Sequence, residues 1–295
     1  MKNSITVLSP AKINLGLDIK ERFPNGYHDV RMVMQSLDLC DTVHVHRVAY
    51  SNPEDRITCS SPGTDLPTDK SNLALRAFTM LFDEFELEGG MHIILDKKIP
   101  LAAGLAGGSG DAAAVLTAVN ELFELGLSDE ELCARGVQIG ADIPFCIMRG
   151  TMLAEGIGEK LTRLPSLWGD CVLLVKPDIK VSSKWAYETW DHADEKYHPD
   201  IDGMIEHLPD VAPFVGNSFE PIIAGRYPIV RQIKEDMLRY GALGAAMTGS
   251  GPTVFGLFED DIAMHYAAET MRRLYPDTFV SETHFVAETH MKTSL

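Results

Sequence analysis

The stretch from Pro100 to Ala114, PLAAGLAGGSGDAAA, constrains the fold of this chain most, because it places four glycines among small residues. A strand-like apolar run, Met91–Leu95, precedes it, and a run with helical spacing, Asp111–Leu125, follows it. We expect Ser109 or Asp111 to cap the first helical turn. The order of strand, glycine loop and helix N-terminus favours phosphate binding, because free N–H groups and the helix dipole point at such a loop.

The glycine loop by itself leaves two alternatives open. It is not a Walker A motif, which needs Lys and then Ser or Thr after the last glycine, and its glycines lack the GxGxxG spacing. A glycine- and alanine-rich turn that only lets a helix pack closely on a sheet would have the same composition. The rest of the chain therefore has to decide between phosphate binding and close packing.

Composition limits the class of protein. The chain has 295 residues, of which 45% are hydrophobic, enough for one large or two ordinary domains. A formal net charge of −17 disfavours nucleic acid as a partner. No apolar run reaches the ~20 residues of a membrane span, and the N-terminal stretch lacks the apolar core of a signal peptide. The five cysteines have no CxxC spacing, which predicts a cytoplasmic protein with reduced thiols. The same pattern argues against a zinc site and against disulfide bonds.

Apolar periodicity predicts an α+β protein. The expected strands are residues 5–8, 11–20, 41–48, 56–59, 91–95, 171–175, 245–248, 253–258 and 278–285, with further strands within 145–164. The expected helices are residues 72–85, 111–125, 128–139, 182–190, 229–240 and 261–274, and residues 191–213 are expected to form a loop with at most a short helix. A composition change near residues 165–169 predicts two domains, 1–165 and 166–295.

Several separated motifs together resemble those of the GHMP kinase superfamily. They are SPAKINLGLDI, GYHDVRMVMQSLDLCD, IPLAAGLAGGSGDAAA, GADIPFCIMRG, AEGIGEKLT and MTGSGPTVFGLF. The resemblance implies a ribosomal-protein-S5-like, ATP-binding domain over residues 1–165 and a ferredoxin-like domain over 166–295. It also implies Mg²⁺-assisted transfer of the ATP γ-phosphoryl group to an alcohol in the cleft between the domains. The implied branch phosphorylates the 2-hydroxyl of a sugar alcohol linked to cytidine diphosphate, in non-mevalonate isoprenoid synthesis.

Two residues resemble the catalytic pair of the superfamily. Asp142 in GADIP resembles the catalytic base, and Lys12 in PAKINL resembles its partner lysine. A lysine within an apolar strand must be paired or must extend its ammonium group to solvent. Beside Asp142, Lys12 would lower the pKa of the carboxyl group or orient the substrate hydroxyl. The alternatives are an aspartate in an ordinary turn and a lysine on the solvated face of an edge strand.

The resemblance also implies an ATP site around the glycine loop. Ser109 is expected to hold Mg²⁺ or phosphate, while Asn72 could instead be a plain N-cap and Lys97 could be merely solvated. The expected ATP-binding residues are Pro100, Leu101, Ala102, Ala103, Gly104, Leu105, Ala106, Gly107, Gly108, Ser109, Gly110, Asn72 and Lys97. Gly110 replaces a serine that is common in the superfamily loop, and we expect a Gly110→Ser substitution to be tolerated.

Five residues resemble positions that contact the substrate. A cytosine is expected between the rings of Tyr27 and Tyr187, with His28 reading its hydrogen-bonding edge. Asn14 and Ser183 resemble polar contacts to the substrate. The alternative for the GYH stretch is a structural tyrosine followed by a surface histidine.

Two other functions compete with this interpretation. One is a GHMP kinase for a small alcohol such as mevalonate or homoserine, which GYH and Tyr187 disfavour because those substrates have no base to stack. The other is a non-catalytic nucleotide-binding regulator, which Lys12, Ser109 and Asp142 together disfavour. We expect only small-molecule partners, neither nucleic acid nor membrane; the oligomeric state is left open, a homodimer being one alternative.

Overall fold

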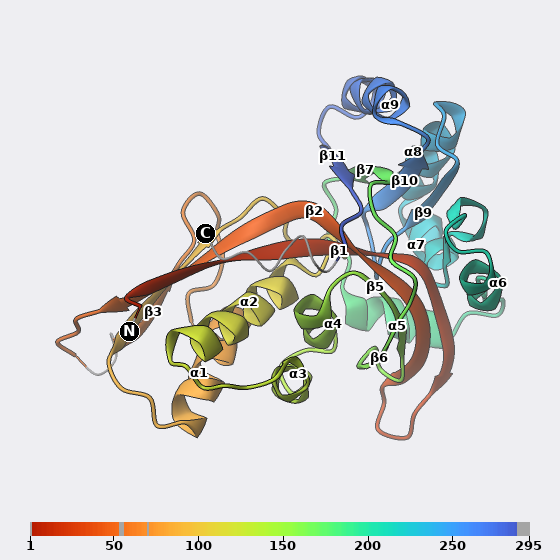
Figure 1. The fold of residues 1–295 in the computed structure, drawn as a ribbon. Coiled ribbons are helices and arrows are strands. Elements are labelled where there is room, and N and C mark those ends of the chain that lie inside the picture. Colours follow the sequence, from red (N-terminus) through yellow and green to blue (C-terminus); the bar gives the residue numbers. More distant parts are fainter. Residues whose placement is uncertain (1, 53–55, 70, 288–295) are drawn as a thin grey trace.

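The computed structural model describes residues 2–52, 56–69 and 71–287, which form two sheets with helices packed against each (Figure 1). The first sheet has seven strands: β3-β4-β2-β1-β8 in order, with β5 pairing with β2 and β6 with β5. The second has four strands in the order β11-β7-β10-β9. Within the described residues, no helix has the length and apolar character needed to cross a membrane.

The first sheet is built around two long strands, β1 (Ser4–Arg22) and β2 (His28–Val48), which pair antiparallel. Residues 9–19 of β1 are all buried, so the alternation of buried and exposed side chains is lost there. The sequence predicts two shorter strands in place of β1 because Ser9-Pro10 is typical of a break, whereas β1 runs through both residues without interruption. The remaining strands are β3 (Ile57–Ser60), β4 (Gly90–Asp96), β5 (Thr151–Glu155), β6 (Lys160–Arg163) and β8 (Gly216–Asn217).

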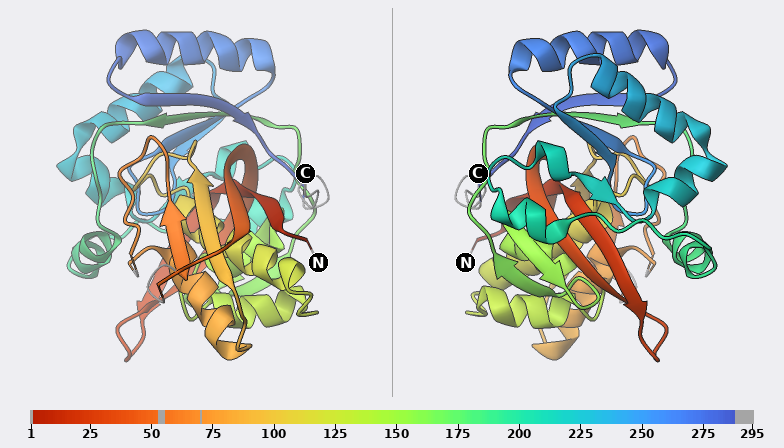
Figure 2. Two further views of the ribbon diagram at one scale, coloured as in Figure 1. Left: turned by 90° about the vertical axis from the view of Figure 1, so that its left-hand side faces the viewer. Right: turned by 90° about the vertical axis from the view of Figure 1, so that its right-hand side faces the viewer.

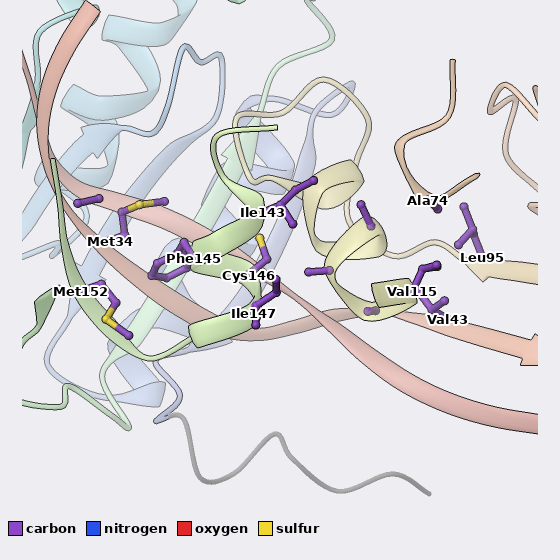
Figure 3. Packing of buried hydrophobic residues seen from close by; sticks show 14 of the residues in the cluster. Met34, Val43, Ala74, Leu95, Val115, Ile143, Phe145, Cys146, Ile147 and Met152 are labelled. Atoms are coloured by element: carbon purple, nitrogen blue, oxygen red, sulfur yellow. The ribbon is translucent and has the colours of Figure 1, made fainter. Parts of the chain in front are cut away.

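Four helices lie on one side of the β1–β2 ribbon (Figure 1). They are α1 (Leu73–Glu84), α2 (Gly107–Leu122), α3 (Asp129–Gly136) and α4 (Ile143–Met148). Ile143 and Phe145 of α4 share an apolar cluster with Met34 of β2 and Met152 of β5 (Figure 3). This packing fixes the N-terminus of α4, where Asp142 is the N-cap.

The second sheet consists of β7 (Cys171–Lys176), β9 (Gly244–Met247), β10 (Val254–Phe258) and β11 (Phe279–His284). Helices α8 (Pro228–Arg239) and α9 (Asp261–Leu274) cover its outer face (Figure 2). The other elements are α5 (Ser183–Asp191), α6 (Ile201–Glu206), the 3₁₀ turn η2 (Ala212–Phe214) and α7 (Glu220–Arg226). Strand β8 pairs with β1 and so joins the first sheet. The domain boundary at residue 165 stays a prediction.

The start of α2 differs from the predicted capping. The helix begins at Gly107, and its N-cap, Ala106, has a left-handed backbone with φ of 57° and no side-chain cap. Ser109 and Asp111 lie inside the helix, so the prediction that one of them caps it is wrong. Helix α4 is also absent from the predicted elements, because six residues starting at an Ile-Pro pair are too few to show helical periodicity.

Candidate active site

A cavity of about 590 Å³ lies where the glycine loop, β1 and the second glycine turn, Gly249–Gly251, come together. Most of the residues predicted for ATP, substrate and catalysis line it: Lys12, Asn14, Lys97, Pro100, Leu101, Ala102, Ala103, Gly104, Leu105, Ala106, Gly107, Gly108, Ser109, Asp142, Ser183 and Tyr187. Asn72, Gly110, Tyr27 and His28 are not among the lining residues. The structure therefore brings together residues from both halves of the chain.

The two glycine turns pack backbone against backbone. Gly104 has φ of +76°, and a Cβ added there would lie 2.6 Å from the carbonyl oxygen of Thr248. Gly249 has φ of +58°, and its added Cβ would lie 2.9 Å from the carbonyl oxygen of Gly104. At these two positions the close-packing alternative explains the glycines, because any side chain would separate the turns.

Gly108 has a different environment. A Cβ added there would approach no atom outside its helix and chain neighbours closer than Leu73 Cδ1, at 3.8 Å, an ordinary contact. The residue lines the cavity at the first turn of α2, where backbone N–H groups have no partner within the helix. Packing does not require glycine at this position, whereas close approach of a ligand to the backbone does. The helix dipole adds partial positive charge at the same place.

Lys12 and Asp142 lie together at the cavity. The Lys12 ammonium is 3.6 Å from Asp142 Oδ2 and donates a hydrogen bond of 2.7 Å to Asn14 Oδ1. The Lys12 side chain is only 5% exposed and that of Asp142 is 35% exposed. Because the Lys12 side chain is buried, the alternative of a lysine on a solvated face is wrong. The backbone N–H of Lys12 also donates to Leu105 O at 3.2 Å, which joins β1 to the glycine loop.

Two residues of the second half support these groups and were missed by the sequence analysis. Thr248 Oγ1 accepts a hydrogen bond of 2.8 Å from the backbone N–H of Asn14. Ser250 Oγ lies 2.8 Å from Ser183 Oγ. The motif MTGSGPTVFGLF contains both, but sequence spacing alone does not show which of its side chains reach across to the first sheet.

Lys97 is buried, with its side chain 3% exposed, so the alternative of a solvated lysine is wrong. Its ammonium group contacts Asp111 Oδ2 at 2.5 Å and also binds Asp41. Asp41 in turn accepts hydrogen bonds from the N–H groups of Lys98 and Ile99, at 2.6 and 2.8 Å. Burial raises the pKa of Asp111 to about 6, with nearby Lys97 opposing the shift and Asp41 adding to it. Nothing in the sequence marked Asp41 as part of this cluster.

Asn72 and Gly110 have clear structural roles. The Asn72 side chain caps α1 by accepting a 2.9 Å hydrogen bond from Ala74 N–H, as the N-cap alternative requires. A Cβ added at Gly110 would lie 2.6 Å from Ser9 Oγ. Glycine there lets α2 approach β1, and a side chain at this position would first meet the Ser9 hydroxyl. Nucleotide contacts of either residue stay predictions.

His28 and Tyr187 form a stacked pair, with ring centroids 4.5 Å apart and an interplanar angle of 19°. His28 is buried, and its Nε2 lies 2.6 Å from Asp191 Oδ1, so the surface-histidine alternative is wrong. Burial raises the pKa of Tyr187 to about 12, which keeps its phenol protonated. Tyr27 is 59% exposed and lies outside the cavity lining, so the structure does not place Tyr27 and Tyr187 on two sides of one space.

Comparison with known families identifies the class of protein. The model for the N terminal domain of GHMP kinases matches residues 72–150, and the model for their C terminal part matches residues 208–277. The glycine loop at the start of α2 lies within the first match. The chain is therefore a GHMP kinase, a phosphotransferase.

Relatives with higher sequence identity show which branch of the GHMP kinases this chain belongs to. A 4-diphosphocytidyl-2-C-methyl-D-erythritol kinase from Lachnospira eligens is 48% identical, covering 92% of this chain and 94% of that protein. The enzyme of that name from Acetivibrio thermocellus is 41% identical, covering 95% and 99%. This chain belongs to the 4-diphosphocytidyl-2-C-methyl-D-erythritol kinase family.

Solved structures agree with this assignment. A crystal structure of 4-(cytidine 5'-diphospho)-2C-methyl-D-erythritol kinase matches with a TM-score of 0.81 at 29% identity, covering 96% of this chain and all of that one. A homoserine kinase from Cytophaga hutchinsonii matches with a TM-score of 0.73 at 19% identity, covering 97% of this chain and 96% of that one. The second likeness shows the fold alone. The predicted two-domain GHMP kinase fold is confirmed.

Proposed function

We propose that this chain transfers the γ-phosphoryl group of ATP to the 2-hydroxyl of 4-diphosphocytidyl-2-C-methyl-D-erythritol, giving the 2-phosphate and ADP. The observation that carries the proposal is the Lys12–Asp142 pair, which shares one cavity with the N-terminal turn of α2. Phosphoryl transfer needs positioning, charge neutralisation and an acceptor for the hydroxyl proton, and these two features supply groups for each. The names of the relatives support the choice of substrate.

In this proposal the ATP phosphates lie against the first turn of α2. The N–H groups of Gly107, Gly108 and Ser109 point from a positive helix end into the cavity. The residues present fit Mg²⁺, because the Ser109 hydroxyl and the Asp142 carboxylate are oxygen donors at the same cavity. Mg²⁺ would neutralise charge on the triphosphate, and Ser109 is the residue we assign to hold it.

Asp142 takes the proton of the acceptor hydroxyl. Its carboxylate is partly exposed to the cavity and sits at the N-terminus of α4. The buried Lys12 ammonium lies 3.6 Å away and can orient the incoming hydroxyl. Asn14 fixes the ammonium by accepting one of its hydrogen bonds, so the lysine is held in place before substrate binds.

The cytidine moiety is assigned to the end of the cavity where Tyr187 and Ser183 lie. Tyr187 supplies an aromatic ring to this end of the cavity. His28 stacks on Tyr187 and is held by Asp191 outside the cavity lining, so it reads the pyrimidine edge only if its ring turns toward the cavity. Tyr27 reaches the base only if the turn between β1 and β2 moves toward the cavity. A mevalonate or homoserine substrate would leave this aromatic end without a partner.

A coupled assay of ADP release with a panel of alcohols tests the proposal. We expect turnover with 4-diphosphocytidyl-2-C-methyl-D-erythritol, much lower turnover with its uridyl analogue, and none above background with mevalonate or homoserine. The Asp142→Asn variant is the control for contaminating kinases. Equal or better turnover of a small alcohol would move the assignment to another GHMP kinase, and binding of ATP without transfer to any alcohol would favour a regulator.

A further inference from the structure

The second sheet holds a cluster of Cys171, Asp261 and His284 at the end that contacts the first sheet. His284 pairs directly across from Cys171 in the antiparallel register of β11 and β7. Cys171 also pairs with Phe258, the last residue of β10, and Asp261 follows three residues later as the first residue of α9. The topology therefore brings together three residues that are far apart in sequence. Figure 2 shows α9 lying across this sheet.

The three side chains present one ligand atom each within a small volume. Cys171 Sγ lies 3.5 Å from Asp261 Oδ1, and His284 Nε2 lies 2.7 Å from the same carboxylate oxygen. All three ligand atoms fall within 4.8 Å of one another. Cys171 is buried, while His284 and Asp261 reach solvent, so a cation can enter from one side.

Asp38 of β2 orients the histidine. The backbone N–H of His284 donates to Asp38 Oδ1 at 3.0 Å, and His284 Nδ1 lies 3.3 Å from Asp38 Oδ2. A carboxylate on Nδ1 leaves Nε2 directed at the other two ligand atoms, which is the arrangement that metal-binding histidines use. Asp261 is also free for this role, because Asp260 caps α9 by accepting from Ala263 N–H.

From this geometry we propose that Cys171, Asp261 and His284 bind a zinc-type divalent cation, with water completing the coordination shell. Thiolate, imidazole and carboxylate together suit Zn²⁺, whereas Mg²⁺ prefers oxygen ligands alone. The absence of CxxC spacing excludes only sites whose ligands are close in sequence, and here three separate elements supply them. None of the three residues, nor Asp38, lines the proposed kinase cavity. The ion would join β7, β11 and α9 and, through Asp38, β2 of the first sheet.

Cobalt is the probe for this site, because a Co²⁺–thiolate bond absorbs in the near ultraviolet and reports cysteine ligation directly. The full untagged chain is titrated with Co²⁺ in the absence of air. We expect one equivalent to produce the thiolate charge-transfer band, one equivalent of Zn²⁺ to abolish it, and excess Mg²⁺ to leave it unchanged. The Cys171→Ser variant should lose the band and the control Cys133→Ser should keep it. No band in the wild type, or a band that survives Cys171→Ser, would overturn the proposal.

A second set of variants guards against misfolding of Cys171→Ser, whose side chain is buried. Asp261→Asn changes an exposed carboxylate that is a direct ligand in this proposal, so we expect it to weaken Co²⁺ binding by more than the about 10- to 100-fold that loss of an outer-sphere partner costs. Glu259→Gln, which changes a nearby exposed carboxylate, should bind as the wild type does. Asp38→Asn should weaken affinity about 10- to 100-fold while keeping the thiolate band. Zn²⁺ should raise the melting temperature of the wild type, of Cys133→Ser and of Glu259→Gln by similar amounts, and that of Asp261→Asn much less. Equal cobalt affinity for Asp261→Asn and Glu259→Gln would show that the cluster is a hydrogen-bond network alone.

Discussion

The Lys12 ammonium group lies 3.6 Å from the Asp142 carboxylate. The Lys12 side chain is the more deeply buried of the two, and its ammonium group donates a hydrogen bond to Asn14 Oδ1. Both residues line the cavity, and the carboxylate is the more accessible member of the pair. This asymmetry supports the proposal that Asp142 accepts the proton and that Lys12 stabilises charge.

We therefore expect Asp142→Asn to lower kcat by roughly 10²–10⁴-fold, about 3–5 kcal/mol of barrier, because the amide cannot accept the hydroxyl proton. ATP affinity, measured by calorimetry with a non-hydrolysable analogue, should stay close to that of the wild type. Lys12→Met should also lose most activity, and its melting temperature must be compared because Lys12 is buried. Wild-type kcat in Asp142→Asn would remove the base assignment.

Gly108→Ala tests the approach of ATP to the loop. The new Cβ has ordinary contacts in the free protein, so we expect an unchanged melting temperature and weaker binding of the ATP analogue. Gly104→Ala is the packing control. Its positive φ and its 2.6 Å approach to Thr248 O should lower the melting temperature. If Gly108→Ala binds ATP as tightly as the wild type does, the loop glycines serve packing alone.

Gly110→Ser should destabilise the protein, in contrast to the expectation from the sequence. The Cβ would lie 2.6 Å from Ser9 Oγ and 3.4 Å from Pro10 O, so the buried Ser9 side chain must rotate or α2 and β1 must separate slightly. Overpacking of this kind costs about 1–3 kcal/mol, which urea unfolding can measure. Adding Ser9→Ala to Gly110→Ser should restore most of the loss. A double variant no more stable than Gly110→Ser would place the strain elsewhere.

The Asp41–Lys97–Asp111 cluster predicts a pH effect on stability. Asp111 has its pKa raised from 3.8 to about 6, so the native state binds more protons than the unfolded state between these values. Its contribution is fully present below about pH 4 and is lost as the pH rises through 6, by up to about 3 kcal/mol. Urea unfolding across this range should show a flatter profile for Asp111→Asn. The exposed control Asp83→Asn should follow the wild type, and parallel profiles for all three would contradict the shift.

Substrate discrimination should depend on the His28–Tyr187 pair. Tyr187→Ala is expected to raise KM for the cytidyl substrate about 10- to 100-fold through lost stacking, while Tyr187→Phe keeps it. His28→Ala and Asp191→Asn should both relax the preference for cytidine over uridine, because Asp191 orients the His28 ring. Substrate titrations at saturating ATP check all four variants. Unchanged KM and preference throughout would mean that the base is bound elsewhere.

The sequence by itself determined the order of most helices and strands, because burial of one face of an element places apolar residues at regular spacing along the chain. It also indicated the glycine loop and, through the resemblance to the GHMP kinases, the motifs that contain Lys12 and Asp142 and the separate aromatic residue Tyr187. The continuity of β1 through residues 9 and 10 and the six-residue α4 escaped it, because a Ser-Pro pair is typical of a break in a strand and a helix this short shows no periodicity.

Only the tertiary structure decided which side chains meet. The pairing of Lys97 with Asp41 and Asp111, of His28 with Asp191, and of Asn14 with Thr248 spans 14 to 234 positions of sequence. The cluster of Cys171, Asp261 and His284 likewise depends on the register of β7, β10 and β11. Contacts of this kind leave no local pattern, because strand register and helix packing, rather than spacing along the chain, bring the groups together.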